Sequence, residues 1–228
     1  MVWVLVAGAY AQEGPDRDPA YRFIANWQLP KQDGLYERWD PNRSWASAHV
    51  VSTLQVVAER LALELPLADP LMIGDISRKG GGHMEGHSTH HLGIDVDIGI
   101  FMDDARQPLG GFVDVEPSRM DLHANWVLIR ALMDTEQMAF TLLDQSLIDA
   151  LRDYVSNTVG LDKASVEAIF PPPTRRLSWS VRNVIRHAPN HKHHFHVRLV
   201  PPQLEDELPP PIASISVGPR AARAEDEA

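Results

Sequence analysis

The histidines of this 228-residue sequence are the residues whose spacing points to chemistry. Seven of the eleven histidines lie in two short windows, one from Gly86 to Asp97 and one from His191 to His196. The sequence contains no cysteine, so a metal ion would have to be held by imidazole and carboxylate groups. Zinc accepts this combination of ligands when thiolates are absent. The two windows therefore predict a site for zinc.

Both windows are predicted to contain strands that place their polar side chains on one face. Residues 94–101 alternate strictly between apolar and other side chains, so Asp95 and Asp97 share a face of that strand. Residues 193–200 alternate in the same way, with apolar side chains directed into the core. The polar face of this second strand consists of His194, His196 and Arg198. If the two strands are neighbours, the acidic and histidine faces meet in one pocket.

The expected ligand types indicate a catalytic rather than a structural ion. A structural zinc is usually closed by four protein ligands, whereas a catalytic zinc has three and leaves one position for water. Two neutral imidazoles and one carboxylate leave the ion with about one net positive charge. This charge lowers the pKa of water at the ion and polarises a substrate carbonyl. The residues themselves therefore indicate metal-assisted hydrolysis of an amide.

A specific resemblance rests on two motifs. His90 and Asp97, with six residues between them, stand in the pattern G-H-S-T-H-x-x-G-x-D-V-D, and the later window reads H-x-x-H-x-H-V-R-L. Together the motifs resemble the penicillin-insensitive murein endopeptidases, zinc peptidases of the group that includes lysostaphin, D-Ala-D-Ala carboxypeptidases and the Hedgehog signalling domain. The resemblance covers roughly residues 25 to 202. This chain departs from the family in lacking its paired cysteines and in the loop at residues 80–85.

The resemblance implies a role for each residue of the two windows. The implied zinc ligands are His90, Asp97 and His196. By the same resemblance, His194 lies beside the metal water as a base or polarising group. His191 would stabilise the tetrahedral intermediate or protonate the leaving amine. His87 would be a supporting residue or an extra ligand, and Asp95 would orient a histidine through its other ring nitrogen.

The implied function is that of a zinc-dependent endopeptidase acting on the peptide cross-links of peptidoglycan, with the D-alanyl to meso-diaminopimelate bond as substrate. Two alternatives stay open: a D,D- or L,D-carboxypeptidase acting on stem peptides, and a non-catalytic zinc-binding recognition module. His194 and His191 favour an enzyme, because a binding site needs no basic groups beside an open coordination position. The implied location is the cell envelope, periplasmic or secreted, and the oligomeric state stays open.

We expect an α+β fold, in which a small antiparallel sheet bears the metal site, helices pack behind it and long loops frame a groove. Hydrophobic periodicity predicts helices over residues 44–64 and 121–133 and a further helix that begins after Asp144. Short apolar or alternating runs predict strands. The predicted strands are residues 71–76, 94–101, 138–143 and 193–200.

One domain accounts for most of the chain. With 44% hydrophobic residues, the sequence can bury a single core, which we place with the zinc peptidase activity in residues 25–202. Residues 1–24 are interpreted as a trimmed export signal or a first strand, and residues 203–228 as a flexible acidic tail containing prolines. The net charge of −10 disfavours nucleic acid as a partner. No apolar run reaches the roughly 18–20 residues of a membrane span.

Overall fold

The computed structural model describes residues 25–170 and 184–201. The two terminal segments predicted from the sequence, residues 1–24 and 203–228, lie outside the described residues. Within the described part of the chain, none of the helices has the length and apolar character needed to cross a bilayer.

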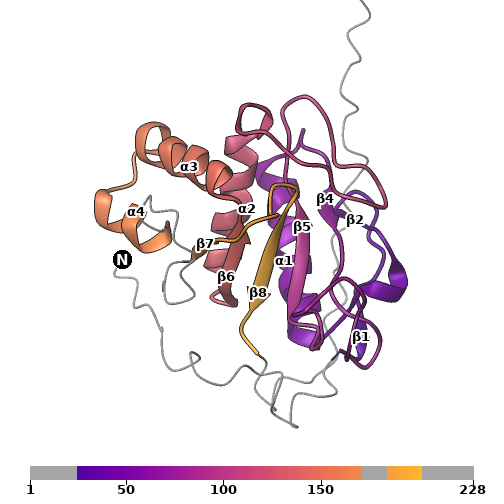
Figure 1. Ribbon diagram of the computed structural model, residues 1–228. Helices are drawn as coiled ribbons and strands as arrows, with labels where there is room; N and C mark the ends of the chain where they lie inside the picture. Colours follow the sequence, from indigo (N-terminus) through magenta and orange to yellow (C-terminus); the bar gives the residue numbers. More distant parts are fainter. Residues whose placement is uncertain (1–24, 171–183, 202–228) are drawn as a thin grey trace, which may run out of the picture.

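A six-stranded sheet forms the centre of the molecule, with the strand order β2-β4-β5-β8-β6-β7 (Figure 1). Its strands are β2 (Tyr36–Arg38), β4 (Leu71–Ile73), β5 (Asp95–Gly99), β8 (His194–Leu199), β6 (Met138–Leu143) and β7 (Ile185–His187). The four central strands pair antiparallel, whereas β2 and β7 pair in parallel at the two edges. Strands β1 (Trp27–Gln28) and β3 (Trp45–Ala46) form a separate two-stranded antiparallel sheet.

The α+β class is confirmed, and the main sheet is larger than predicted and mixed rather than wholly antiparallel. The two strands that the sequence analysis missed in this sheet, β2 and β7, are three residues long. In these two short segments, the alternation of apolar and polar side chains is too brief to distinguish a strand from a loop. Both lie at an edge and pair in parallel, which accounts for the difference from the predicted sheet.

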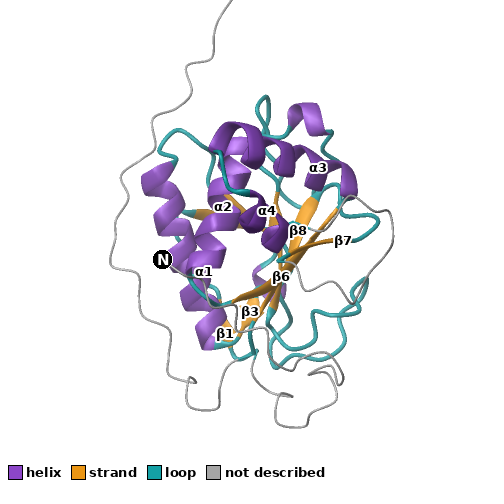
Figure 2. Ribbon diagram, turned by 90° about the vertical axis from the view of Figure 1, so that its left-hand side faces the viewer, coloured by secondary structure: helices purple, strands orange, loops and turns teal. Residues whose placement is uncertain are grey.

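The helices α1 and α2 cover one face of the sheet, and loops run over the opposite side (Figures 1 and 2). The helices are α1 (Ala48–Glu64), α2 (Leu122–Asp134), α3 (Gln145–Tyr154) and α4 (Lys163–Ile169), and a π-helical turn (Val155–Val159) follows α3. Asp144 caps α3 as predicted, because its carboxylate accepts a hydrogen bond from the Ser146 amide at 3.0 Å. The short helix α4 was not predicted.

Strand β8 separates the apolar core from the polar face of the sheet. Phe195, Val197 and Leu199 are buried in the core, and burial of one such side chain contributes about 1.5–3 kcal/mol to folding. His194 and His196 alternate with them and therefore lie on the opposite face. The predicted division of this strand into an apolar and a polar face is confirmed.

Gly93 fixes the loop that leads from the first histidine window into β5. Its φ is +71°, and a Cβ added there would lie 2.8 Å from the Cβ of Ala25 and 2.9 Å from the Cα of Ala46. The carbonyl of Gly93 also accepts a hydrogen bond from the Ser47 amide at 3.2 Å. Only glycine allows this close approach of two backbones together with a left-handed conformation.

We predict that Gly93→Ala destabilises the protein more than Gly110→Ala does. Gly110 also has a positive φ, +87°, but a Cβ added there would meet nothing within 4 Å. The left-handed backbone should lower the free energy of unfolding of both variants by about 1–2 kcal/mol. Steric overlap should lower that of Gly93→Ala by about a further 1–3 kcal/mol. Urea unfolding measures the difference, and equal losses for the two variants would show that the contact with Ala25 and Ala46 does not constrain the loop.

Candidate functional site

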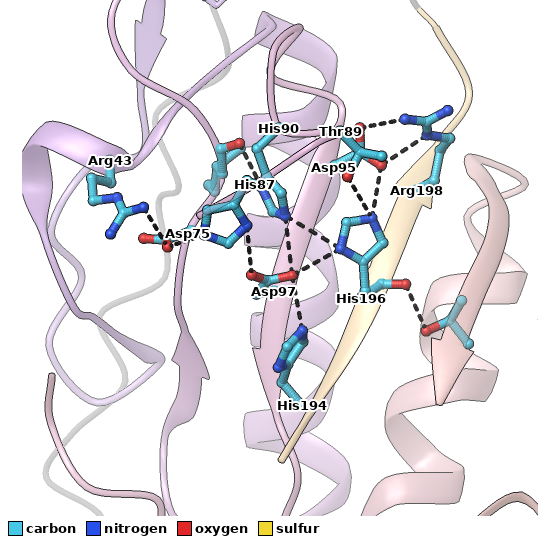
Figure 3. Close-up of polar contacts among 12 residues, drawn as sticks. Arg43, Asp75, His87, Thr89, His90, Asp95, Asp97, His194, His196 and Arg198 are labelled. Carbon is cyan, nitrogen blue, oxygen red and sulfur yellow. Dashed lines mark hydrogen bonds and ion pairs between the residues drawn. The ribbon is translucent and has the colours of Figure 1, made fainter. Parts of the chain in front are cut away.

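The polar faces of β5 and β8 meet in the middle of the sheet. The two strands are antiparallel neighbours, with Asp97 opposite His196 and Asp95 opposite Arg198. Both aspartates are almost completely buried, with exposed fractions of 0% for Asp95 and 3% for Asp97. The predicted meeting of an acidic and a histidine face is therefore present, and Figure 3 shows the side chains converging on Asp97.

The carboxylate of Asp97 is surrounded by imidazoles. Its Oδ1 lies 3.2 Å from His90 Nε2, 3.0 Å from His196 Nδ1 and 3.3 Å from His194 Nε2. Burial opposes the charged form of Asp97, but hydrogen bonds from His194, His196 and His90 hold the pKa of its carboxyl well below the usual value. Asp97 is therefore an anion at which three histidines from two distant parts of the chain meet, His90 from its loop and His194 and His196 from β8.

His90 and His196 each direct one ring nitrogen at this point and use the other to fix the ring. The Nδ1 of His90 lies 2.8 Å from the carbonyl oxygen of Ile76, and because a carbonyl can only accept, Nδ1 donates. The Nε2 of His90 therefore faces Asp97. The Nε2 of His196 lies 3.1 Å from Oδ1 of Asp95, which leaves Nδ1 of His196 directed at the centre.

Asp95 is held in place by a bidentate ion pair. Its two carboxylate oxygens accept hydrogen bonds from Nε and NH2 of Arg198, both at 2.8 Å. Burial raises the pKa of the Asp95 carboxyl, but hydrogen bonds from His196 and Arg198 outweigh burial, and the pKa is lowered. The result is a fixed anion behind His196, in the position that a carboxylate commonly occupies behind a metal-ligating histidine.

The two carboxylates also determine the protonation of His196. Burial disfavours the imidazolium, but hydrogen bonds and charge from Asp95 and Asp97 raise the pKa of His196 to about 9. In the protein without metal, His196 is therefore positively charged at neutral pH and compensates the buried anions. A bound cation would supply the same compensation and take the place of the proton.

The three predicted ligands fit the donor set and spacing that zinc requires. Ligand atoms at tetrahedral positions about 2.0–2.1 Å from zinc lie about 3.3–3.4 Å from one another. The three ligand atoms, His90 Nε2, Asp97 Oδ1 and His196 Nδ1, are separated by 3.2, 3.0 and 3.3 Å. These atoms thus form one face of a tetrahedron of nearly the right size.

His191 and His194 lie beside this triangle. His191, His194 and His196 bring one ring nitrogen each within 4.8 Å of one another. The Nδ1 of His191 donates to the carbonyl of Pro189 at 2.9 Å, which fixes its ring with Nε2 exposed for other contacts. Burial, reinforced by the neighbouring histidines, lowers the pKa of His191 to about 4, so this imidazole is neutral at physiological pH.

His87 lies on the other side of the centre, with its ring between two aspartates. Its Nε2 lies 2.8 Å from Oδ2 of Asp75, and its Nδ1 lies 3.9 Å from Oδ2 of Asp97. Asp75 is also paired with Arg43 at 3.0 Å. With His90 and Asp97, His87 forms a second group of possible metal ligands whose atoms lie within 4.8 Å of one another.

The structure brings all seven predicted site residues into one cluster and adds two that the sequence analysis did not assign to the site. Asp75 is buried and contacts His87, and its position at the end of an apolar run was a signal that could have drawn attention to it. Phe112 stacks on His194 with a distance of 5.3 Å between ring centroids. Phe112 belongs to a glycine-containing loop, in which no periodicity marks a site residue.

Comparison with known proteins agrees with the resemblance seen in the motifs. A sequence model described as penicillin-insensitive murein endopeptidase matches residues 24–209. A protein of Haemophilus influenzae named penicillin-insensitive murein endopeptidase is 26% identical over 177 residues, which are 76% of this chain and 58% of the relative. The chain therefore spans less than two thirds of the length of that relative.

We predict that the metal-free protein loses stability as the pH rises from 6.5 to about 9. The pKa of His196 is higher in the folded protein, about 9, than its ordinary value of 6.5. Its stabilising contribution is therefore fully present below pH 6.5 and lost as the pH rises through about 9. Bound zinc should remove this fall, because the ion replaces the proton.

Urea unfolding at a series of pH values, with zinc and with chelator, measures both parts of this prediction. His196→Gln is the control, since it has no titrating group in this window and should show a smaller fall. A stability that is constant from pH 6.5 to 9 in the chelated wild-type protein would contradict the assignment of His196 as the charged partner of Asp95 and Asp97.

Proposed function

Because the chain belongs to the family of penicillin-insensitive murein endopeptidases, we propose that it is a zinc-dependent endopeptidase of peptidoglycan. The bond hydrolysed is an amide of the peptide cross-links, with the D-alanyl to meso-diaminopimelate bond as the expected target. Peptidoglycan lies in the cell envelope, so the proposed site of action is periplasmic or extracellular.

The observation that carries this proposal is the triangle of ligand atoms from His90, Asp97 and His196, with separations of 3.0–3.3 Å. Each imidazole already directs one nitrogen at the centre, so little rearrangement is needed to bind a metal. Such a site would bind zinc through two histidines and one aspartate, with Asp95 and the Ile76 carbonyl holding the histidine rings. Zinc bound in this way supplies a Lewis acid that polarises the substrate carbonyl and makes water more acidic.

We assign to His194 the movement of the proton during hydrolysis. It lies on the same strand face as His196, two residues or about 7 Å along the strand. Its Nε2 is 3.3 Å from Oδ1 of Asp97, which places the nitrogen beside the proposed ligands. From this position His194 can accept a proton from the attacking water and pass it on, the role of a general base.

His191 is assigned to the leaving amine and the developing oxyanion. Its ring lies 5.2 Å from that of His194 and 6.0 Å from that of His196, measured between centroids. A histidine whose pKa is lowered to about 4 gives up a proton readily once it carries one. In the neutral ring Nδ1 carries the proton that it donates to Pro189, so Nε2 of His191 would accept the proton that His194 takes from the attacking water. That proton would then pass from Nε2 to the nitrogen of the leaving amine as the amide bond breaks.

The arrangement also bears on the alternatives. A recognition module needs no basic groups beside the ligands, and His191 and His194 both lie there. A carboxypeptidase needs a cation for the terminal carboxylate of its substrate. Among the residues that the structure describes, Arg43 and Arg198 are each held by a carboxylate of the site, that of Asp75 or Asp95. Both arginines are thus already paired, which favours the endopeptidase over the carboxypeptidase as far as residues 25–170 and 184–201 are concerned.

We predict that the zinc-loaded protein cleaves cross-linked muropeptides into monomers and that a chelator abolishes the cleavage. Mass spectrometry of purified muropeptides measures the products directly. Release of terminal D-alanine from uncross-linked stem peptides would identify a carboxypeptidase instead. Unchanged muropeptides in the zinc-loaded sample would refute the proposed function.

Two variants on β8 should separate metal binding from proton transfer. His196→Ala should lose both zinc and activity, because it removes a ligand. His194→Ala should keep about one zinc per chain and lose on the order of 10² to 10⁴-fold in turnover. Elemental analysis and muropeptide digestion give the two measurements.

The matched control for these variants is His123→Ala, which removes a histidine on α2 that contacts Tyr154. This variant should keep both zinc and turnover. Equal loss of zinc and activity in His194→Ala would show that His194 is a ligand. Full turnover in that variant would move the proton-handling role to His191.

A further inference from the structure

We propose that Phe112 is a positioning residue that holds the imidazole of His194 in its working orientation. This inference rests on the proposed function, in which His194 moves the proton. Phe112 lies in the loop between β5 and α2, far in sequence from β8, and neither sequence motif includes it.

The first observation is the contact between the two rings. The rings of Phe112 and His194 are stacked, with 5.3 Å between centroids and 30° between planes. This distance lies in the range of favourable offset stacking, which is about 4.5–7 Å between ring centroids. The Nε2 of the same His194 ring lies 3.3 Å from Oδ1 of Asp97. Phe112 thus covers the imidazole while leaving its reactive nitrogen at the metal ligands.

The second observation is that the chain lacks side chains where the Phe112 ring lies. A Cβ added to Gly74 would lie 2.8 Å and 2.9 Å from two ring carbons of Phe112. A Cβ added to Gly99 would lie 3.0 Å from the same ring. Gly99 is the β5 residue paired with His194, and the Gly74 amide donates to the carbonyl of Asp97. The lack of a side chain at Gly74 and at Gly99 therefore leaves the space that the Phe112 ring occupies beside the site.

The third observation is a clamp that joins the Phe112 loop to β8. The side chain of Gln107 accepts a hydrogen bond from the Val113 amide at 2.9 Å and donates to the Val113 carbonyl at 3.4 Å. The side-chain Nε2 of Gln107 also donates to the carbonyl of His193 at 3.3 Å. Val113 follows Phe112, and His193 precedes His194. One buried glutamine thus fixes the neighbours of both stacked residues.

The remaining contacts restrict the ring from other sides. Trp39 lies against Phe112 with 3.9 Å between centroids, so Phe112 is itself supported. His193 stacks on His194 at 4.4 Å and His191 lies at 5.2 Å. These histidines are close in sequence to His194 and belong to the same segment at the start of β8. Phe112 is the contact supplied by a separate, clamped loop, and its removal would free the imidazole to turn away from Asp97.

The test compares three variants of the full chain. Phe112→Ala removes the ring, and Gly74→Ala displaces it without changing Phe112 or His194, because the φ of Gly74 is not positive and a Cβ would overlap the ring. Gly111→Ala is the control, since a Cβ there meets nothing within 4 Å. Phe112→Ala and Gly74→Ala should keep zinc and lose on the order of 10 to 10²-fold in kcat with little change in KM. Gly111→Ala should keep both its zinc and its kcat.

A double variant separates positioning from other roles. If Phe112 acts through His194, the kcat of the double variant Phe112→Ala/His194→Ala should be within about twofold of the kcat of His194→Ala. Phe112→Leu, which restores apolar bulk without a flat ring, should recover part of the kcat. A raised KM with unchanged kcat would overturn the proposal by identifying Phe112 as a substrate contact. Full additivity of the two losses would overturn it as well.

A measurement without substrate keeps this proposal distinct from the proposed function. Stacking on Phe112 should shift the ring protons of His194 upfield in the NMR spectrum of histidine-labelled, zinc-loaded protein, with the signal assigned from His194→Ala. Phe112→Ala and Gly74→Ala should remove the shift, and Gly111→Ala should retain it. A His194 signal that is unchanged by Phe112→Ala would overturn the positioning role even in an active enzyme. A wild-type protein that shows the shift and cleaves no muropeptide would refute the proposed function alone.

Discussion

The burial of two carboxylates on one strand is the constraint on which the rest of the site depends. Removing an ionised carboxylate from water costs several kcal/mol unless charges and hydrogen bonds compensate it. Asp97 is compensated by imidazoles, and Asp95 by Arg198 and His196. Because neither aspartate can remain buried without these partners, the sheet must bring β8 against β5, and the loop of His90 must fold over both strands.

The same compensation explains why the site suits a metal ion. Protons on the histidines and a divalent cation would satisfy the same buried anions, so the arrangement already has the shape that the proposed metal site requires. The ring nitrogens of His90 and His196 that face away from the centre are held by the Ile76 carbonyl and by Asp95. In the proposed function, stability and catalysis would use one set of contacts, and the stacked Phe112 would add His194 to that set.

Local periodicity in the sequence predicts the strands that bear the site, but it does not predict every residue of the site. The alternation around Asp97 and His196 predicts which side chains share a face, because the strand period is two. The pairing of the strands was a hypothesis, since register depends on contacts across about a hundred residues. Asp75 could have been found from its position at the end of an apolar run. Phe112 could not be assigned, because its role depends on a loop shaped by glycine geometry and by single side chains such as Gln107. The edge strands β2 and β7 were missed because each has only three residues and includes charged or polar side chains, whereas the equally short β4 lies in an apolar run.

X-ray absorption spectroscopy of the zinc-loaded protein tests whether this triangle of side chains binds a catalytic zinc. The ion should be four-coordinate, with nitrogen and oxygen ligands at about 2.0–2.1 Å, two of them imidazoles. In His90→Ala and His196→Ala, any residual bound zinc should show one imidazole fewer, and in His194→Ala the imidazole number should stay at two. A six-coordinate ion bound only by oxygen, or an unchanged spectrum in His90→Ala and His196→Ala, would contradict the account.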